Sequence, residues 1–384
     1  MTRAVSASDW REAARRRLPR AIFDYIDGGA YGEVTLGRNT VAFDHIQLRQ
    51  RVMVDVSALS LSKTLLGQPF SMPVMLGPVG MAGMYARRGE AQAARAAENA
   101  GVPFALSTVS ICDIEETRAT VTTPPWFQLY MLKDRGYMAA LLERAQAAGS
   151  PVLVFTVDLP VPGARYRDAR NGLARPGGIA DRLARAVATL GHPAWLWDVG
   201  LRGRPHTFGN VLGAVAGARG IADFWTWVGA NFDPGVTWAD IDWVRERWDG
   251  PILLKGVMDA EDAVLALKTG VEGIVVSNHG GRQLDGVPAS IQALPAIVRA
   301  VEGRARVLMD GGVRSGLDVL KALALGAEAV MLGRAWAFAL GGAGGAGVSA
   351  MLGVMRRELM VAMALTGCVD VNAAGPSLLL DGGR

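Results

Sequence analysis

Cysteine is scarce in this chain of 384 residues, which contains only Cys112 and Cys368. Two isolated thiols form neither a disulfide framework nor the paired spacing of a metal site, so we expect ordinary core roles for both and no bound metal. The amino-terminal residues include Arg3, Asp9 and Arg11 and contain no apolar run, which is unlike a signal peptide. These features predict a protein of the reducing cytoplasm.

The sequence also lacks a basic stripe interleaved with aromatic residues. Its formal net charge is +4, and the basic residues are scattered along the chain. We therefore expect no nucleic-acid partner. A mild positive balance favours small acidic substrates and contact with an anionic membrane surface.

Only one long uncharged apolar run is present, at residues 335–355. It is about long enough to cross a bilayer. However, several glycines crowd its middle, and each lowers helix propensity by about 1 kcal/mol. We interpret the run as a helix at the end of a soluble fold and predict no transmembrane helix.

Short apolar strands recur along the chain, and four of them follow a helix-like stretch that ends in glycine. Gly101, Gly149, Gly270 and Gly326 occupy this position, where glycine closes a helix in the left-handed conformation. Eight strands are predicted at residues 73–76, 104–106, 126–130, 152–156, 252–255, 273–276, 306–309 and 329–332. Alternating helices and near-continuous apolar strands indicate an α/β fold with a parallel sheet.

The polar residues distinguish a (β/α)8 TIM barrel from a doubly wound open sheet. They fall at or just after many successive strand ends: Gln128 and Tyr130, Thr156 and Asp158, Lys255, Ser277 and His279, Asp310, Gly333 and Arg334. An open sheet would gather its site at one switch point, whereas a barrel spreads it over many strand ends. We therefore predict a TIM barrel at residues 71–370, preceded by a helical segment at residues 1–70, in one domain spanning residues 1–384.

A long insertion is predicted after the fourth strand, at about residues 172–236. It contains Trp195, Trp197, Trp225 and Trp227 among arginines. Tryptophan with arginine is typical of an interfacial membrane segment, and a self-packed lid over the active site is the alternative. We favour a role at a membrane surface, with the barrel not depending on residues 178–233.

The run at residues 277–285 carries the clearest chemistry, because it places His279 and Arg282 at the mouth of an apolar strand. An imidazole near neutral pKa can accept a proton, and an arginine fork can hold a carboxylate. Gly280 and Gly281 between them permit a sharp turn and a close approach to a ligand. A polar loop with a capping histidine is the alternative interpretation.

This run resembles the signature of the FMN-dependent 2-hydroxy acid oxidases and dehydrogenases. The resemblance extends from Asp24 to about Gly367 and is closest to the respiratory, quinone-linked L-lactate dehydrogenases. It implies that FMN accepts a hydride equivalent, that His279 is the base and that Asp158 orients it. The implied substrate-binding residues are Tyr25, Tyr130, Arg165 and Arg282.

The resemblance also implies a complete flavin site, with Lys255 facing the polar edge of the ring. The other residues implied around the ring are Pro78, Val79, Gly80, Ser107, Gln128, Thr156 and Ser277. Barrels commonly bind phosphate in the loops after strands seven and eight. That position here contains Asp310, Gly311, Gly312, Arg314, Gly333 and Arg334.

The expected reaction is oxidation of L-lactate to pyruvate, with electrons passed to a membrane quinone by a homotetramer on the inner face of the cell membrane. Gly80 stands where many oxidases have alanine, which favours a dehydrogenase over an oxygen-using oxidase. Val109 replaces the tryptophan of glycolate oxidases, so mandelate or another larger hydroxy acid is an alternative. From other classes, the alternatives are a Schiff-base aldolase or isomerase using Lys255 and a non-catalytic membrane scaffold.

Overall fold

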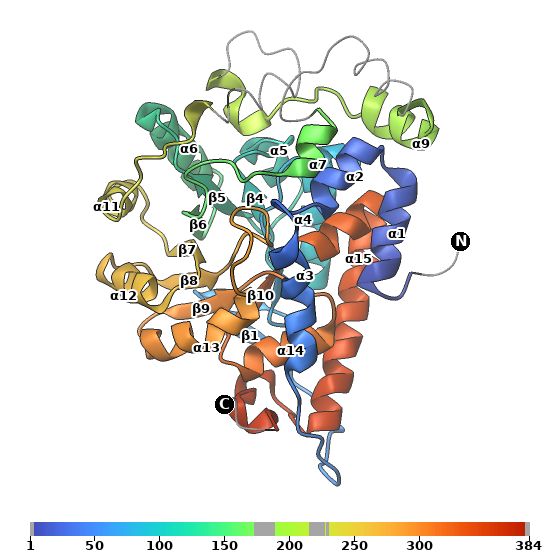
Figure 1. The fold of residues 1–384 in the computed structure, drawn as a ribbon, viewed down its shortest axis with the longest axis vertical. Helices are drawn as coiled ribbons and strands as arrows, with labels where there is room; N and C mark the ends of the chain where they lie inside the picture. Colours follow the sequence, from blue (N-terminus) through green and yellow to red (C-terminus); the bar gives the residue numbers. More distant parts are fainter. Residues whose placement is uncertain (1–3, 173–188, 215–226, 228–229, 381–384) are drawn as a thin grey trace.

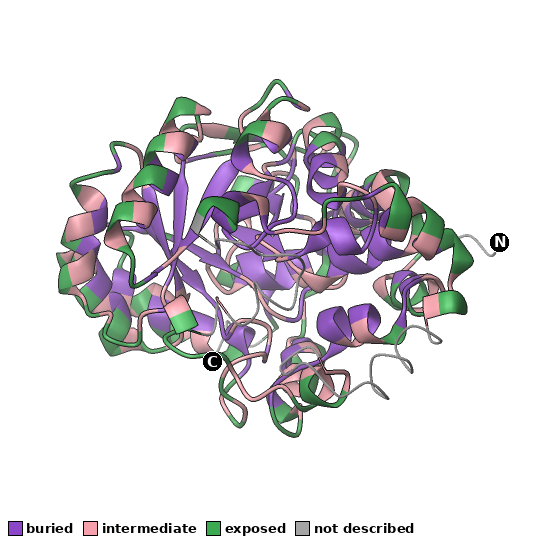
Figure 2. Ribbon diagram, turned by 90° about the horizontal axis from the view of Figure 1, so that it is seen from above, coloured by how far each residue is buried: buried purple, intermediate pink, exposed green. Residues whose placement is uncertain are grey.

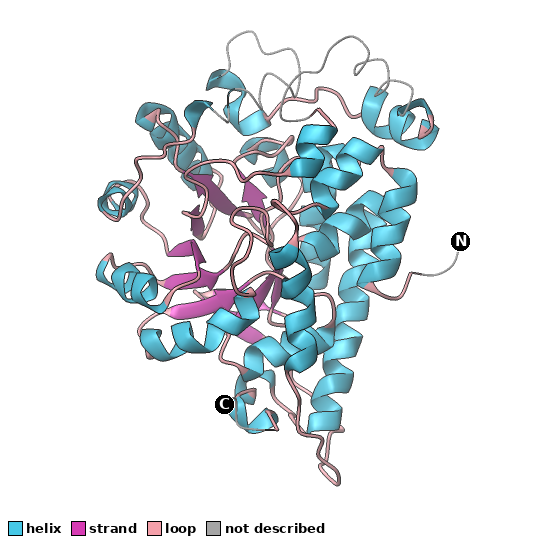
Figure 3. Ribbon diagram, viewed as in Figure 1, coloured by secondary structure: helices cyan, strands magenta, loops and turns pink. Residues whose placement is uncertain are grey.

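The computed structural model describes residues 4–172, 189–214, 227 and 230–380. Eight parallel strands form a barrel surrounded by helices (Figure 3). The strands are β3 (Val74–Leu76), β4 (Ala105–Ser107), β5 (Trp126–Tyr130), β6 (Leu153–Thr156), β7 (Ile252–Val257), β8 (Gly273–Val276), β9 (Arg306–Met309) and β10 (Ala329–Leu332). Each pairs with its neighbour in sequence, β10 pairs with β3, and a bridge from Leu76 to Phe104 closes the ring. The predicted TIM barrel is confirmed.

Helices cover the outside of the barrel, and their buried faces pack on the strands (Figure 2). They are α4 (Gly89–Ala100), α5 (Ile114–Arg118), α6 (Arg135–Ala147), α11 (Ala239–Arg245), α12 (Ala260–Lys268), α13 (Ser290–Val301), α14 (Gly316–Ala324) and α15 (Arg334–Thr366). Gly101, Gly149, Gly270 and Gly326 have φ of 67°, 77°, 71° and 102°. These left-handed glycines end helices as predicted, because residues with a Cβ adopt this conformation only at a cost.

The amino-terminal region differs in part from the prediction of a helical segment. Helices α1 (Ala7–Arg17), α2 (Arg20–Asp27) and α3 (Val34–Val41) are present, but residues 63–70 form the antiparallel hairpin of β1 (Lys63–Leu65) and β2 (Gln68–Phe70). Leu65 and Phe70 of the hairpin are buried with the apolar residues inside the barrel, including Trp126. The hairpin therefore closes the end of the barrel at which the strands begin.

Helix α15 contains the apolar run and is kinked, with non-helical backbone at Ala343 and Gly344. It is the one helix in the described ranges that is long and apolar enough to cross a membrane, and half of its most apolar stretch is buried inside the protein. A Cβ on Gly341 would lie 2.9 Å from the Leu18 side chain that follows α1. The glycines thus let α1 approach α15 closely, which is the packing of a core helix.

The described parts of the insertion lie above the barrel near α7 (Tyr166–Arg170), where α9 (Pro193–Trp195) leads into a π-helical turn at residues 196–201 (Figure 1). Trp195 is 7% exposed and donates a hydrogen bond to the Met84 carbonyl, whereas Trp197 is 61% exposed. Asn210 is fully buried, and its side-chain amide bonds the Ser107 carbonyl and the Ser110 hydroxyl. Trp225 lies outside the described residues.

The insertion therefore contributes to the packed core, and the expectation that the barrel does not depend on residues 178–233 needs correction. Trp195 bonds the segment that follows β3 and Asn210 bonds the end of β4, so a linker in place of the whole segment would leave buried groups unpaired. The sequence did not distinguish Trp195 from Trp197, because the two lie in similar sequence contexts. In the structure their side chains point in opposite directions, and Trp195 is buried while Trp197 faces solvent.

We predict that Trp195→Ala lowers the free energy of unfolding by about 3–5 kcal/mol, because it empties a buried site and removes a hydrogen bond. Trp197→Ala is the matched control and should change it by less than about 0.5 kcal/mol, since its ring is mostly in solvent. Urea unfolding followed by circular dichroism measures both. Equal losses in the two variants would contradict the assignment of Trp195 to the core.

Candidate active site

The site is built by the alternation of side chains along the barrel strands. Residues that face the barrel interior recur every second position. The interior apolar cluster includes Ala105, Trp126, Val154, Leu253, Val275, Leu308 and Met331. Two residues further along each strand stand Ser107, Gln128, Thr156, Lys255, Ser277, Asp310 and Gly333. Six polar side chains and one glycine, each from a separate strand or its end, therefore converge above the apolar residues inside the barrel.

His279 follows β8 and meets Asp158, which follows β6. The Nδ1 atom of His279 lies 3.0 Å from Oδ1 of Asp158, and both side chains are mostly buried. Burial lowers the pKa of His279, and Lys255 and Arg165 lower it further, while Asp158 only partly offsets them. Burial alone would raise the pKa of Asp158, but His279 and Lys255 bring it below its ordinary value. At neutral pH the pair is thus a neutral imidazole held by a carboxylate.

Lys255 faces the barrel interior from β7 and forms an ion pair with Asp310. Its Nζ lies 2.9 Å from Oδ2 of Asp310 and 2.9 Å from the Ser277 hydroxyl. Burial alone would lower the pKa of Lys255, but Asp310 and Asp158 outweigh it and raise the pKa. The ammonium is therefore a fixed positive charge at the centre of the site.

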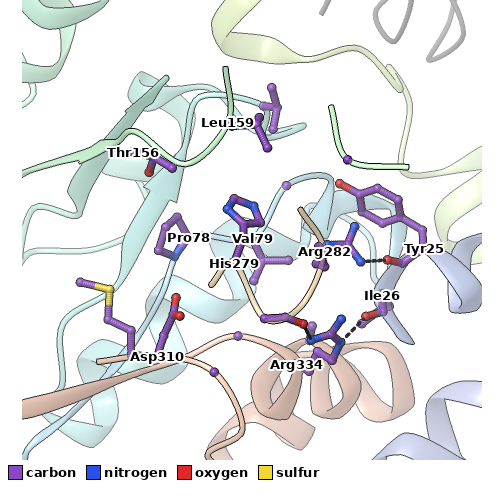
Figure 4. Close-up of a pocket in the computed structure, with 18 of the residues that line it drawn as sticks. Tyr25, Ile26, Pro78, Val79, Thr156, Leu159, His279, Arg282, Asp310 and Arg334 are labelled. Carbon is purple, nitrogen blue, oxygen red and sulfur yellow. Dashed lines mark hydrogen bonds between the residues drawn. The ribbon is translucent and has the colours of Figure 1, made fainter. Parts of the chain in front are cut away.

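Two arginines from different loops, Arg165 and Arg282, line the same cavity as His279, and Figure 4 shows Arg282 near the histidine. Arg282 donates from Nη1 to the backbone carbonyls of Tyr25 and Gly28, and its guanidinium lies 4.7 Å from the centre of the Tyr25 ring. Arg165, just before α7, donates from Nε to the Arg282 carbonyl at 3.2 Å. Burial lowers the pKa of Arg165, and the charge of Arg282 adds to this effect. Two neighbouring cations with little solvent favour an anionic ligand.

The loops after β9 and β10 add glycines and two more arginines to the site. Gly311 and Gly312 have φ of 92° and 89°, and a Cβ on Gly312 would collide with the Asn39 carbonyl. Burial lowers the pKa of Arg314 to about 10, although Asp318 acts against it. Arg334 begins α15 and donates to the carbonyls of Ile26, Gly28 and Gly280 (Figure 4). Backbone N–H groups at two helix starts and these cations form a suitable site for a phosphate.

A cavity of about 320 Å³ joins these groups. The predicted site residues that line it are Tyr25, Pro78, Val79, Gly80, Tyr130, Thr156, Arg165, Lys255, His279, Arg282, Asp310, Gly311, Gly312, Arg314, Gly333 and Arg334. Four predicted site residues lie just behind the residues that line the cavity, and they contact those residues or one another: Asp158, Ser107, Gln128 and Ser277. The structure thus brings all predicted site residues into one region.

Several lining residues were not among the predicted site residues. Leu159 and Phe232 add apolar surface, and Asp168 adds a carboxylate. Phe232 comes from the end of the insertion, where a bridge to Leu132 holds it with its ring 5.1 Å from that of Tyr130. Asp168 could have been found from its spacing, because residues three apart share a helix face and Arg165 is three residues earlier. No local signal marks Phe232.

The comparisons with known proteins agree with this geometry. Residues 14–381 match the family described as FMN-dependent dehydrogenase. An L-lactate dehydrogenase of Caulobacter vibrioides is 57% identical, covering 98% of this chain and 97% of that protein. One of Acinetobacter baylyi is 54% identical with the same coverage.

The solved structure of the monotopic membrane protein (S)-mandelate dehydrogenase has a TM-score of 0.92 and 33% identity, covering 98% of this chain and 99% of that one. A mandelate oxidase bound to (S)-4-hydroxymandelic acid has a TM-score of 0.84 and 39% identity, covering 98% of each chain.

The chain therefore belongs to the FMN-dependent dehydrogenase family. It is an oxidoreductase, and its cofactor is FMN. The residues present fit this cofactor. Within the described part of the chain, four buried polar atoms have no hydrogen-bond partner at the barrel mouth: Gln128 Nε2, Thr156 Oγ1, Asp158 Oδ2 and Asp310 Oδ1. Buried polar groups are rarely left unpaired, so these atoms indicate bound polar groups.

We predict that His279→Gln retains FMN but slows flavin reduction by about 10²- to 10⁴-fold, because a base is lost while the cofactor is held by other loops. In the unmutated protein the rate should fall only as pH drops below the pKa of His279, which lies under its ordinary value. Stopped-flow absorbance across a pH series measures both effects. His45→Gln, on an exposed residue, is the control. Reduction of the His279 variant at the unmutated rate would remove this residue from the chemistry.

Proposed function

We propose that the protein oxidises L-lactate to pyruvate. The observation that carries this proposal is that His279, hydrogen-bonded to Asp158, lines one cavity with Arg165 and Arg282. A 2-hydroxy acid needs a base for one proton and cations for its carboxylate, and this cavity offers both. The L-lactate dehydrogenase relatives are 54–58% identical, whereas the mandelate enzymes are 33–39% identical, which supports lactate as the preferred substrate.

Each group in the site has a separate role in the proposed reaction. Bound FMN supplies the acceptor for the hydride equivalent that no side chain can accept. His279 takes the proton at its unprotonated ring nitrogen, and Asp158 holds the tautomer and stabilises the imidazolium. Arg282 and Arg165 orient the carboxylate, and the hydroxyls of Tyr25 and Tyr130 contact the substrate.

The same proposal assigns the remaining residues to the cofactor. The ring would be held by Pro78, Val79, Gly80, Ser107, Gln128, Thr156, Lys255 and Ser277. The phosphate would be held by Asp310, Gly311, Gly312, Arg314, Gly333 and Arg334, with the loop backbones supplying most donors, since the Arg334 side chain already binds three carbonyls.

The aldolase alternative conflicts with the state of Lys255. A lysine that forms a Schiff base needs a lowered pKa, so that the amine is neutral and nucleophilic. Here Asp310 and Asp158 raise the pKa of Lys255 and keep it charged. The membership of the FMN-dependent dehydrogenase family also excludes a non-catalytic scaffold as the main role.

Flavin reduction by a panel of L-lactate, D-lactate, glycolate and L-mandelate tests the substrate. We expect L-lactate to give the highest rate constant divided by Kd, because the L-lactate dehydrogenase relatives are more similar to this chain than the mandelate enzymes are. Faster reduction by L-mandelate would make the protein a mandelate dehydrogenase. Turnover in air that matches turnover with a quinone would make it an oxidase.

We infer that electrons pass to a quinone at an anionic membrane, with the outer face of the π-helical turn resting on the lipid. Trp197 and Leu201 are 61% and 50% exposed there, while Asp198 between them is tied to Arg17 at 3.2 Å and Arg87 at 3.6 Å. Exposed apolar residues with nearby arginines suit the membrane interface. The relative (S)-mandelate dehydrogenase is a monotopic membrane protein. The homotetramer stays a prediction.

We predict that the double variant Trp197→Ser with Leu201→Ser sediments less with anionic vesicles and turns over a hydrophobic quinone more slowly, while flavin reduction by L-lactate is unchanged. Met53→Ser is the control, because this residue is 100% exposed in a loop tied to the far end of α15 (Figure 1). Equal vesicle binding by the double variant and the unmutated protein would contradict the membrane assignment.

A further inference from the structure

A mostly buried carboxylate, Asp168, lies near the two arginines of the cavity and has no part in the chemistry above. Asp168 lines the cavity, and its side chain is 13% exposed. Its Oδ2 lies 3.8 Å from Nη1 of Arg165, which is an ion pair too long to be a hydrogen bond. Among the described residues, Arg165 is the one cation within 4 Å of this carboxylate. A negative charge here opposes the binding of any anion.

The hydrogen bonds of Arg165 show what this carboxylate controls. Nε of Arg165 donates to the Arg282 carbonyl, and Nη2 donates to Oε1 of Gln283 at 3.3 Å. Within the described ranges, Nη1 makes no hydrogen bond and faces Asp168. A ligand carboxylate in the cavity and Asp168 would therefore share the same nitrogen.

Asp168 cannot easily turn away, because α7 is fixed from outside the cavity. Arg167 donates from Nη1 to Oδ2 of Asp27 at 2.8 Å and also pairs with Glu33. Asn171 donates to Oδ2 of Asp24 at 2.8 Å. These contacts from α2 and the loop after it clamp both ends of the short helix, so the carboxylate keeps its place whether or not the cavity is filled.

We propose that Asp168 is a positioning residue that holds Arg165 in the cavity and competes with the substrate carboxylate for it, so that substrate affinity is set below its possible maximum. The proposal rests on the proposed function for the identity of the substrate. The charges of Arg282, Arg165, Asp24 and Arg167 all act on Asp168, and Arg165 is the one of these that forms an ion pair with it. Burial raises the pKa of Asp168 although Arg282 and Arg165 act against it, as expected for a long, loose ion pair. Weaker ground-state binding with a well-oriented arginine favours turnover over affinity.

The test is Asp168→Asn in the full-length FMN-bound protein, with oxalate as a carboxylate probe that needs no oxidation. Calorimetric titration should show oxalate binding about tenfold tighter than in the unmutated protein, because a nearby like charge is gone. With L-lactate, KM and kcat should both fall, since Arg165 loses the partner that orients it. Unchanged or weaker oxalate binding would overturn the proposal, and so would a lowered Tm as the only effect.

Three further variants separate charge from structure. Asp168→Glu keeps the charge and should bind oxalate like the unmutated protein. Asp168→Ser removes the charge with a smaller side chain and should reproduce the tightening even if the asparagine variant folds poorly. Asp24→Asn removes a carboxylate that contacts the same helix outside the cavity, and it should change oxalate affinity less than about twofold. If the neutral variants tighten oxalate binding but L-lactate fails to reduce the flavin of the unmutated protein, the proposed substrate is wrong and the role of Asp168 stands.

Discussion

Alternation of side chains along a strand, in a sheet that closes on itself, is the constraint on which this site depends. Because the ring of strands closes, every interior side chain faces the barrel axis. A strand that directs the apolar Leu253 inward must therefore direct Lys255, two residues later, toward the cavity. The apolar layer below, sealed by the β1–β2 hairpin, keeps water away from the ion pair of Lys255 and Asp310. A shift of one residue in any strand would exchange an interior group for one that packs on the helices.

The strands, the glycine helix ends and most of the site could be predicted from the sequence because their signals are local. A short apolar run followed by His279 and Arg282 carries its own periodicity and its own chemistry. The hairpin at residues 63–70 could not be predicted in this way, since Leu65 and Phe70 are buried only by packing against the apolar interior of the folded barrel. Phe232 is similar, because a single long-range bridge to Leu132 brings it to the cavity.

The direction in which a side chain points also could not be predicted from the local sequence. Trp195 and Trp197 are two residues apart, about 200° around a helix, so one is buried while the other faces solvent. Arg334 matched a phosphate-binding position, yet its guanidinium joins α2, the loop after it and the His279 loop through three carbonyls. The same residue therefore links the amino-terminal segment to the loop that holds the base, which a linear motif does not reveal.

His279 itself has φ of 56°, a left-handed backbone that glycine would adopt freely. For a residue with a Cβ this conformation costs on the order of 1–2 kcal/mol, so the loop stores strain at the position where its imidazole is required. Selection for thermal robustness alone would replace the residue, whereas selection for turnover retains it. A library screened only for heat resistance is therefore expected to drift toward glycine here and to enrich well-folded, flavin-coloured proteins that no longer consume their substrate.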